Sequence, residues 1–326
     1  MNHRLPFSAT LLLLLLAAAA VLGLSLALGS LPLTLGDLWH ALRTNEPSLA
    51  RDVVLDLRLP RALSALAVGG LLALAGAMLQ VLLRNPLADP YVLGVSGGAS
   101  VAALLAIMIG LPAAGVDGMA ALGALAACLM VFALAQGHGG WTPTRLLLTG
   151  VVVAAGAGSV VSLLLALSDD SRLRGMVFWL LGDLSRAERW QWLAGLLLVA
   201  TLASVALGRH LNVLARGETQ AATLGLDVRR LRITVFVLSS LLTGCAVSAA
   251  GSIGFVGLVT PHLVRQGLGS DNRLVLPGSA LLGGILLMAA DLGSRVLLAP
   301  RQLPVGALTA VVGVPIFLLL MSRQRS

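Results

Sequence analysis

The chain has 326 residues and a formal net charge of +8; 58% of its residues are hydrophobic and 11% are charged. A soluble domain carries about 25% charged residues, so a mean hydropathy of +0.96 predicts a membrane protein and excludes a soluble globular domain. Every basic residue is arginine, which excludes a phosphate-binding P-loop and Schiff-base catalysis because both need lysine. Any ATP that drives this protein must therefore bind to another chain.

The apolar runs predict an all-α fold, a polytopic membrane helix bundle with about ten transmembrane helices. A helix needs about 20 residues to cross the hydrocarbon core of a bilayer. The predicted spans are residues 8–29, 59–83, 91–111, 117–136, 144–167, 190–208, 231–250, 254–268, 276–298 and 304–322. The first run follows Arg4 as a signal peptide would, but its length favours an uncleaved helix. Residues 1–326 are treated as a single membrane domain.

Small residues are concentrated in two stretches, AAGAGSVVS (154–162) and GSALLGG (278–284). Small side chains let membrane helices approach closely, so both stretches predict tight helix packing.

The arginines fall mostly beside spans, where they anchor helix ends. The basic pI is therefore no evidence for nucleic-acid binding, and membrane lipid is the expected surroundings of the chain.

A polar loop, residues 211–230 within LNVLARGETQAATLGLDVRRLR, separates the sixth and seventh spans. Asn212 is a candidate N-cap for one helical turn that Gly217 ends. Glu218 then opens a second short helix, ETQAATL, with Gly225 as its C′ residue, and Asp227 would cap the next span. Because helices this short are unstable in water, packing must hold them. A membrane-surface helix is the alternative, although ETQAATLG has no basic residue.

Orientation follows from the arginines. Residues 209–232 hold the densest arginine cluster, with few neighbouring acids, whereas the arginines on the other side lie among many carboxylates. Positive charge favours the cytoplasmic side, so we place this loop inside. An even number of spans then puts both termini in the cytoplasm.

Cys128 and Cys245 both lie within apolar spans, which argues against a disulfide framework. The five histidines are scattered, and no His, Cys or carboxylate cluster has metal-ligand spacing. We therefore expect no metal site and no cofactor on this chain.

His262, in TPHLVR, is interpreted as a structural histidine with a local partner. RNPLADP, residues 84–90, is interpreted as a rigid turn because each proline restricts its neighbour.

Four segments carry a family resemblance. GETQAATLGLDV, residues 58–100 (RLPRALSALAVGGLLALAGAMLQ through VSGGAS), residues 251–295 (GSIGFVGLVTPHLVRQGLG through AADLGSR) and LPVGALTAVVGVPIFLLL occur in the family's order. They resemble the permease subunits of ABC importers for iron chelates, such as ferric siderophores and haem, and for vitamin B12. The resemblance runs from about residue 58 to the end of the chain.

The resemblance implies a ten-span permease of the bacterial inner membrane that works as a pair. Two cytoplasmic ATPase subunits would bind ATP and magnesium, and a periplasmic binding protein would deliver the substrate. It assigns the short helix to ATPase coupling, through Gly217, Glu218, Ala221, Ala222, Leu224, Gly225 and Asp227. It also implies that the inner mouth of the pathway lies near Thr142 and Thr144, where Thr142 caps a span and Pro143 occupies its first turn.

Three arginines on the outer side, Arg58, Arg61 and Arg295, are assigned by the resemblance to docking of the binding protein. Arg58 and Arg61 flank Pro60 at the predicted start of a span. Two cations there oppose the helix dipole by about 0.3–1 kcal/mol each, so local stability does not explain them. Arginine suits carboxylate partners, while simple anchoring at the membrane surface is the alternative. Asp291 and Arg295 are spaced to form an i,i+4 pair that would orient Arg295.

Two other classes of function remain as alternatives. GVSG, residues 94–97, matches the G-x-S-G of rhomboid-type intramembrane serine proteases, with Ser96 as nucleophile; close helix packing is the simpler explanation. An ion-coupled secondary transporter would hold ionisable residues near the bilayer midplane, where these spans offer almost none.

Within the ABC importer class, the first substrate that we expect is a ferric siderophore, haem or a related iron complex. Cobalamin is the alternative substrate.

Overall fold

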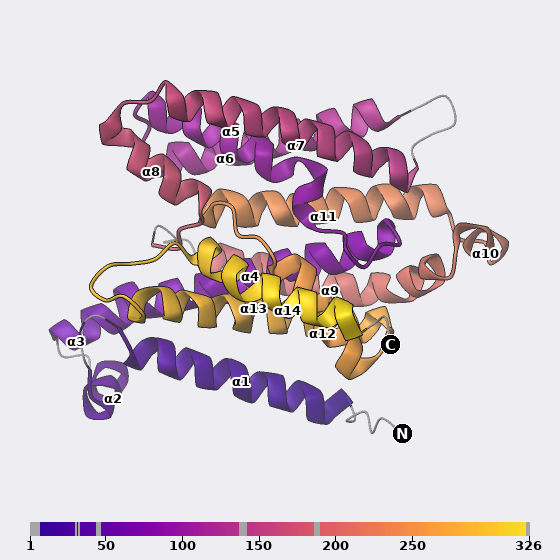
Figure 1. Cartoon of the computed structure of the whole chain (residues 1–326). Helices are drawn as coiled ribbons and strands as arrows, with labels where there is room; N and C mark the ends of the chain where they lie inside the picture. The colour runs from indigo at the N-terminus through magenta and orange to yellow at the C-terminus, as the bar shows by residue number, and fades with distance from the viewer. Residues whose placement is uncertain are drawn as a thin grey trace.

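The computed structural model describes residues 7–29, 31, 33–43, 47–136, 142–185 and 190–323, and over these residues it contains helices and no β-strand. Most helices run side by side along one direction (Figure 1). Seven are long and apolar enough to cross a membrane: Ser8–Ala27, Leu49–Leu82, Ala113–Ala135, Pro143–Ala166, Trp190–Ala215, Val228–Ala250 and Asn272–Val296. The all-α membrane bundle predicted from composition is confirmed.

Each of the ten predicted spans coincides with a helix. The helices are α1 (Phe7–Ala27), α4 (Leu59–Leu82), α5 (Val95–Met108), α6 (Ala113–Ala135), α7 (Pro143–Ala166), α9 (Trp190–Ala215), α11 (Val228–Ala250), α12 (Val256–Leu268), α13 (Asn272–Val296) and α14 (Val305–Arg323). Of these, α5 has 14 residues and α12 has 13. Both are shorter than the approximately 20 residues that a full span needs.

The two short helices begin at neighbouring irregular segments. The 3₁₀ turn η2 (Pro90–Leu93) leads into α5 through Gly94, and residues 251–255 join α11 to α12. The Tyr91 hydroxyl donates to the Ile253 carbonyl (2.8 Å) and accepts from the Ile253 N–H (2.7 Å). Irregular backbone at membrane depth must find such partners within the protein. Tyr91 therefore joins the starts of two broken helices.

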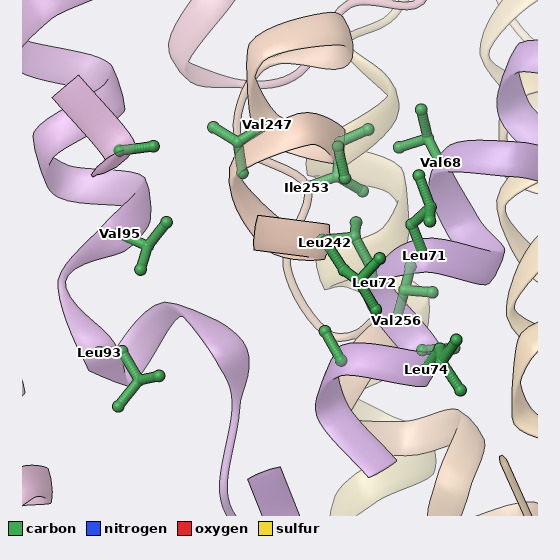
Figure 2. Close-up of a cluster of buried hydrophobic side chains, with 14 of the residues drawn as sticks. Val68, Leu71, Leu72, Leu74, Leu93, Val95, Leu242, Val247, Ile253 and Val256 are labelled. Carbon is green, nitrogen blue, oxygen red and sulfur yellow. The ribbon is translucent and has the colours of Figure 1, made fainter. Parts of the chain in front are cut away.

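The core of the bundle is α4, which packs against α13, α11, α9 and α12. Side chains of α4 such as Leu71 and Leu72 are buried with Leu242 of α11 and with Ile253 and Val256 (Figure 2). Two glycine pairs bring the helix backbones together. A Cβ at Gly69 would clash with the Gly283 carbonyl of α13, and a Cβ at Gly76 with the Gly257 carbonyl of α12.

The two small-residue stretches have different environments. Gly283 and Gly284 of α13 lie against the α4 backbone, as predicted for close packing. In α7, Ala154 and Ala157 contact Gly97 of α5, whereas Gly156 and Gly158 face open space. Only one side of that stretch therefore packs against a neighbouring helix.

Four elements differ from the predictions. The predicted helical turn capped by Asn212 is wrong, because α9 continues through it to Ala215 with Leu211 and Leu214 buried. The helix containing α4 begins ten residues before the predicted span, as α3 (Leu49–Asp52) and the π-helix η1 (Val53–Arg58). Two helices were not predicted, α2 (Leu35–Arg43) and α8 (Asp170–Leu180). Both are too short and too polar to resemble spans.

Candidate functional site

The predicted coupling helix is α10 (Glu218–Thr223), which lies beyond the ends of α9 and α11 (Figure 1). It lies at the end of the bundle where α1 begins and α14 ends. The α2–α3 region lies at the opposite end. The start of α1 and the end of α14 thus lie at the same end as the charged loop, and the assignment of that end to the cytoplasmic side stays a prediction.

Two glycines delimit α10. Gly217 precedes it with φ +125° and Gly225 follows it with φ +80°, a backbone region that glycine adopts without steric cost. Within α10, Ala221 is fully buried, whereas Ala222 is exposed; Leu224, which follows the helix, is 70% exposed. A small helix thus presents a small residue and one large apolar side chain to the exterior.

Glu218 attaches α10 to the bundle. Its Oε1 lies 3.3 Å from Nη2 of Arg84, at the end of α4, and the same oxygen pairs with Arg232 of α11. Asp227 caps α11 by accepting from the Arg230 N–H at 3.0 Å, as predicted. Charge-assisted bonds to two helices fix the orientation of a six-residue element that could not be stable alone.

A second polar cluster joins α9 to the turn between α12 and α13. Asn212 Nδ2 donates to Asp271 at 2.7 Å, and Asn212 Oδ1 accepts from the Asn272 N–H at 2.7 Å. Arg273 also donates to Asp271, and this hydrogen bond holds the pKa of the Asp271 carboxyl well below its usual range. Asn212 therefore links two elements rather than starting a helix.

The RNPLADP segment forms the rigid turn that its prolines predict. Asn85 accepts from the Leu87 N–H at 2.9 Å, and Asp89 caps η2 by accepting from the Tyr91 N–H at 2.8 Å. Burial raises the pKa of Asp89 to about 6, and the Tyr91 hydrogen bond opposes that rise. The segment directs the chain from the end of the bundle that carries α10 back into the bundle.

Thr142 and Thr144 lie at the start of α7, at the same end as α10 (Figure 1). Thr142 caps α7 by accepting from the Arg145 N–H at 3.3 Å. Both threonine side chains are exposed. Their assignment to the inner mouth stays a prediction, and the described geometry gives Thr142 a structural role as well.

At the opposite end, Arg58 caps a neighbouring helix. It is only 5% exposed, and its guanidinium donates to the carbonyls of Leu26 (2.6 Å), Ala27 (3.0 Å) and Leu31 (2.6 Å). The Leu26 and Ala27 carbonyls lie at the C-terminal end of α1, where a cation is favoured by the helix dipole, and Leu31 follows that helix in the chain. The prediction that Arg58 lies at the N-terminus of its own helix is wrong, because α3 and η1 precede it; Arg58 instead stabilises the end of α1.

Arg61 and Arg295 share one buried carboxylate. Asp291 has no exposed surface, and its oxygens accept from Arg61 Nε at 2.8 Å and Arg295 Nε at 3.1 Å. The predicted i,i+4 pair is confirmed. Arg295 also donates to the Ser25 hydroxyl of α1 at 2.6 Å, so the cluster joins α1, α4 and α13.

The three predicted docking arginines line one cavity of about 430 Å³ at this end of the bundle. Asp56, Ser185 and Gln302 contribute polar groups to the same wall. Three residues that bond to the predicted ones were not predicted: Arg84, Ser25 and Gln302, which accepts from Arg61 Nη1 at 3.2 Å. Arg84 lies 134 residues from Glu218 in sequence, and no spacing rule connects them.

The serine-protease alternative finds no support in the neighbours of Ser96. Its Oγ lies 3.1 Å from the Ser252 hydroxyl, where a protease needs a general base. Nε2 of His262 lies 3.3 Å from the Gln266 side chain, which agrees with a structural histidine. The secondary-transporter alternative needs an ionisable residue within a span. Asp291 is such a residue, but it is paired with two arginines.

The chain is similar to known transport proteins over nearly its whole length. Residues 13–323 match the FecCD transport family. The vitamin B12 import system permease protein BtuC of Vibrio cholerae is 42% identical over 309 residues, covering 93% of each chain. The hemin transport system permease protein HmuU of Yersinia pestis is 40% identical over 308 residues, covering 91% of this chain and 90% of the relative.

A solved structure gives the same result. The inward-facing structure of a metal-chelate type ABC transporter has a TM-score of 0.83 and 31% sequence identity, covering 97% of this chain and 99% of that one. Sequence and fold thus agree over nearly the whole chain. The chain belongs to the FecCD transport family and is a permease of the ABC importers that serve iron chelates and vitamin B12.

Proposed function

We propose that two copies of this chain form the membrane pathway of an ATP-driven importer in the bacterial inner membrane. Two cytoplasmic ATPase subunits bind ATP and magnesium, and a periplasmic binding protein supplies the substrate. The chain itself needs no cofactor. Both termini and α10 face the cytoplasm, in keeping with the arginine-rich sequence around α10.

The observation that carries this proposal is the geometry of α10. Its exposed residues, including Ala222 and Leu224, form a small projecting surface, while Glu218 and Ala221 hold it to the bundle. A short helix of this kind suits a groove in a partner protein. We assign that groove to the ATPase, whose movement would displace α10 and the helices attached to it.

The outer cavity supports docking of an acidic partner. Asp291 and Asp56 offset two of the three arginine charges, so the cavity keeps one positive charge in excess. Arg61 and Arg295 offer guanidinium groups for a carboxylate. Arg58 shapes the wall through its contacts with α1. An acidic side chain of the binding protein is the occupant that we propose for this cavity.

For the substrate, we propose a ferric siderophore, haem or a related iron complex, carried from periplasm to cytoplasm. Cobalamin is the alternative, since relatives of similar identity are named for haem and for vitamin B12 import. Both candidates are bulky metal complexes. Direct uptake measurements distinguish them.

The test compares cells that lack this chain with cells in which it is restored. Uptake of radiolabelled ferrichrome, hemin and cyanocobalamin is followed in glucose-fed spheroplasts of these cells, supplied with their own periplasmic extract, with the ATP synthase inhibited. Such cells keep their ATP when an uncoupler collapses the proton gradient. We expect uptake of one probe to require the chain, to survive the uncoupler and to stop when arsenate depletes ATP. Uptake that stops with the uncoupler at normal ATP would instead identify a secondary transporter.

A further inference from the structure

We propose that α4 is the mechanical link between the coupling end and the docking end, and that Arg84 is the positioning residue that connects α10 to it. This inference rests on the proposed function, because it requires an ATPase that moves α10. It adds a specific path through the molecule. Arg84 acts through Glu218 and contacts neither substrate nor nucleotide.

The inner end of the path is the Arg84–Glu218 contact. Arg84 follows the C-cap residue of α4, Leu83, and its backbone has φ +48°. A non-glycine residue in this region costs free energy, and glycine is the usual choice there. The side chain at this strained position reaches Glu218, at 3.3 Å. A glycine would relieve the strain but would remove the ion pair.

The Glu218 carboxylate contacts arginines from two segments, one after α4 and one in α11. The oxygen that faces Arg84 also pairs with Arg232, a side chain only 12% exposed in α11. Displacing α10 therefore pulls on α4 and α11 together. These two helices are packed against each other in the core.

The outer end of the same helix carries the docking cluster. Arg61 lies in the first turn of α4 and binds Asp291, and Arg58 immediately precedes α4. With 24 residues and a rise of about 1.5 Å per residue, α4 is about 36 Å long. One unbroken helix thus extends from the docking arginines to the coupling contact.

The packing of α4 favours movement as a rigid body. Its backbone touches α13 at Gly69–Gly283 and α12 at Gly76–Gly257, so sliding or bending within these contacts meets backbone atoms. Packed interfaces of this kind have discrete arrangements rather than continuous flexibility. A displacement imposed at Arg84 is therefore transmitted to Arg61 and the cavity.

The experiment places a reporter cysteine at the outer end and perturbs the inner end. Leu57 is 64% exposed and lines the cavity. We replace Leu57 by cysteine in a background where Cys128 and Cys245 are alanine. The purified permease–ATPase complex is labelled with a membrane-impermeant maleimide, without nucleotide and with MgATP plus vanadate. We expect nucleotide trapping to change the labelling rate by about fivefold or more.

Arg84→Gln should bring the ratio of the two labelling rates close to unity while the complex still hydrolyses ATP. Arg84→Lys keeps a cation near Glu218 and should restore the response. The matched control is Arg230→Gln, because Arg230 pairs with Asp227 within its own turn; it should leave the response unchanged.

Three results would overturn the inference: an unresponsive reporter in the intact complex, an unchanged response in Arg84→Gln, or identical behaviour of Arg84→Gln and Arg84→Lys. Purification of the chain without any ATPase is a different outcome. That result would refute the proposed function itself. A complex that purifies with its ATPase but fails the labelling test would refute only the link through α4.

Discussion

Replacing Asp291 by alanine is expected to destabilise the protein by about 3–5 kcal/mol, the cost of removing one partner from a buried ion pair. The variant leaves the guanidinium groups of Arg61 and Arg295 close together, with side-chain exposures of 13% and 9%. Moving them apart would require repacking where Arg61 and Arg295 join α1, α4 and α13. The measurement is the free energy of unfolding in mixed micelles, titrated with sodium dodecyl sulfate.

The control for this prediction is Asp56→Ala. Asp56 lines the same cavity but is exposed, and surface substitutions usually change stability by no more than about 0.5 kcal/mol. If Asp291→Ala and Asp56→Ala unfolded at the same detergent fraction, Asp291 would not be the centre of the outer cluster. The arginines would then need another counter-charge.

Gly76→Ala is expected to destabilise the bundle by about 1–3 kcal/mol, the usual cost of overpacking a core. The added methyl group would meet the Gly257 carbonyl of α12, and backbone cannot move aside as a flexible side chain does. Relief requires α4 and α12 to separate, which weakens the packing of the most buried helix. The same detergent titration measures this effect.

Gly156→Ala is the matched control for this substitution. It lies in the middle of α7, and a Cβ there meets no atom within 4 Å. Helix propensity favours alanine over glycine by about 1 kcal/mol, so this variant should be as stable as the parent chain or more stable. Equal destabilisation by the two substitutions would contradict the close α4–α12 contact.

The sequence predicted the elements whose physical signal is local. Every span has its own apolar run, and α10 is bounded by Gly217 and Gly225, whose positive φ values match their predicted roles. Asp227 likewise caps the helix that immediately follows it. Hydrophobic runs, caps and helix-ending glycines are each recognised from a short stretch of neighbouring residues, so their prediction needs no tertiary information.

The errors have a common cause, which is tertiary contact. Asn212 is a good N-cap by type, but Asp271 and Asn272 supply its partners and α9 passes through it. Sequence position alone gives Arg58 an unfavourable helix dipole, yet the carbonyls of α1 accept its hydrogen bonds. Those partners lie about 30 or 60 residues away in sequence.

The candidate sites show the same division. The resemblance predicted a docking role for three arginines, and the structure brings all three to one cavity. Neither residue type nor spacing indicated that Arg84 and Arg232 share Glu218. Long-range ion pairs of this kind follow from the fold, and they attach α10 to the core.

The measurement that tests the central claim most directly is a pull-down of the tagged chain from its native membrane in mild detergent, with quantification of the proteins recovered. We predict a P-loop ATPase at equal stoichiometry. Leu224→Ala, which trims the exposed tip of α10, should reduce that recovery strongly. Leu87→Ala, at a 43% exposed leucine in the neighbouring turn, should not. Recovery of the chain without an ATPase, with uptake intact, would contradict the account.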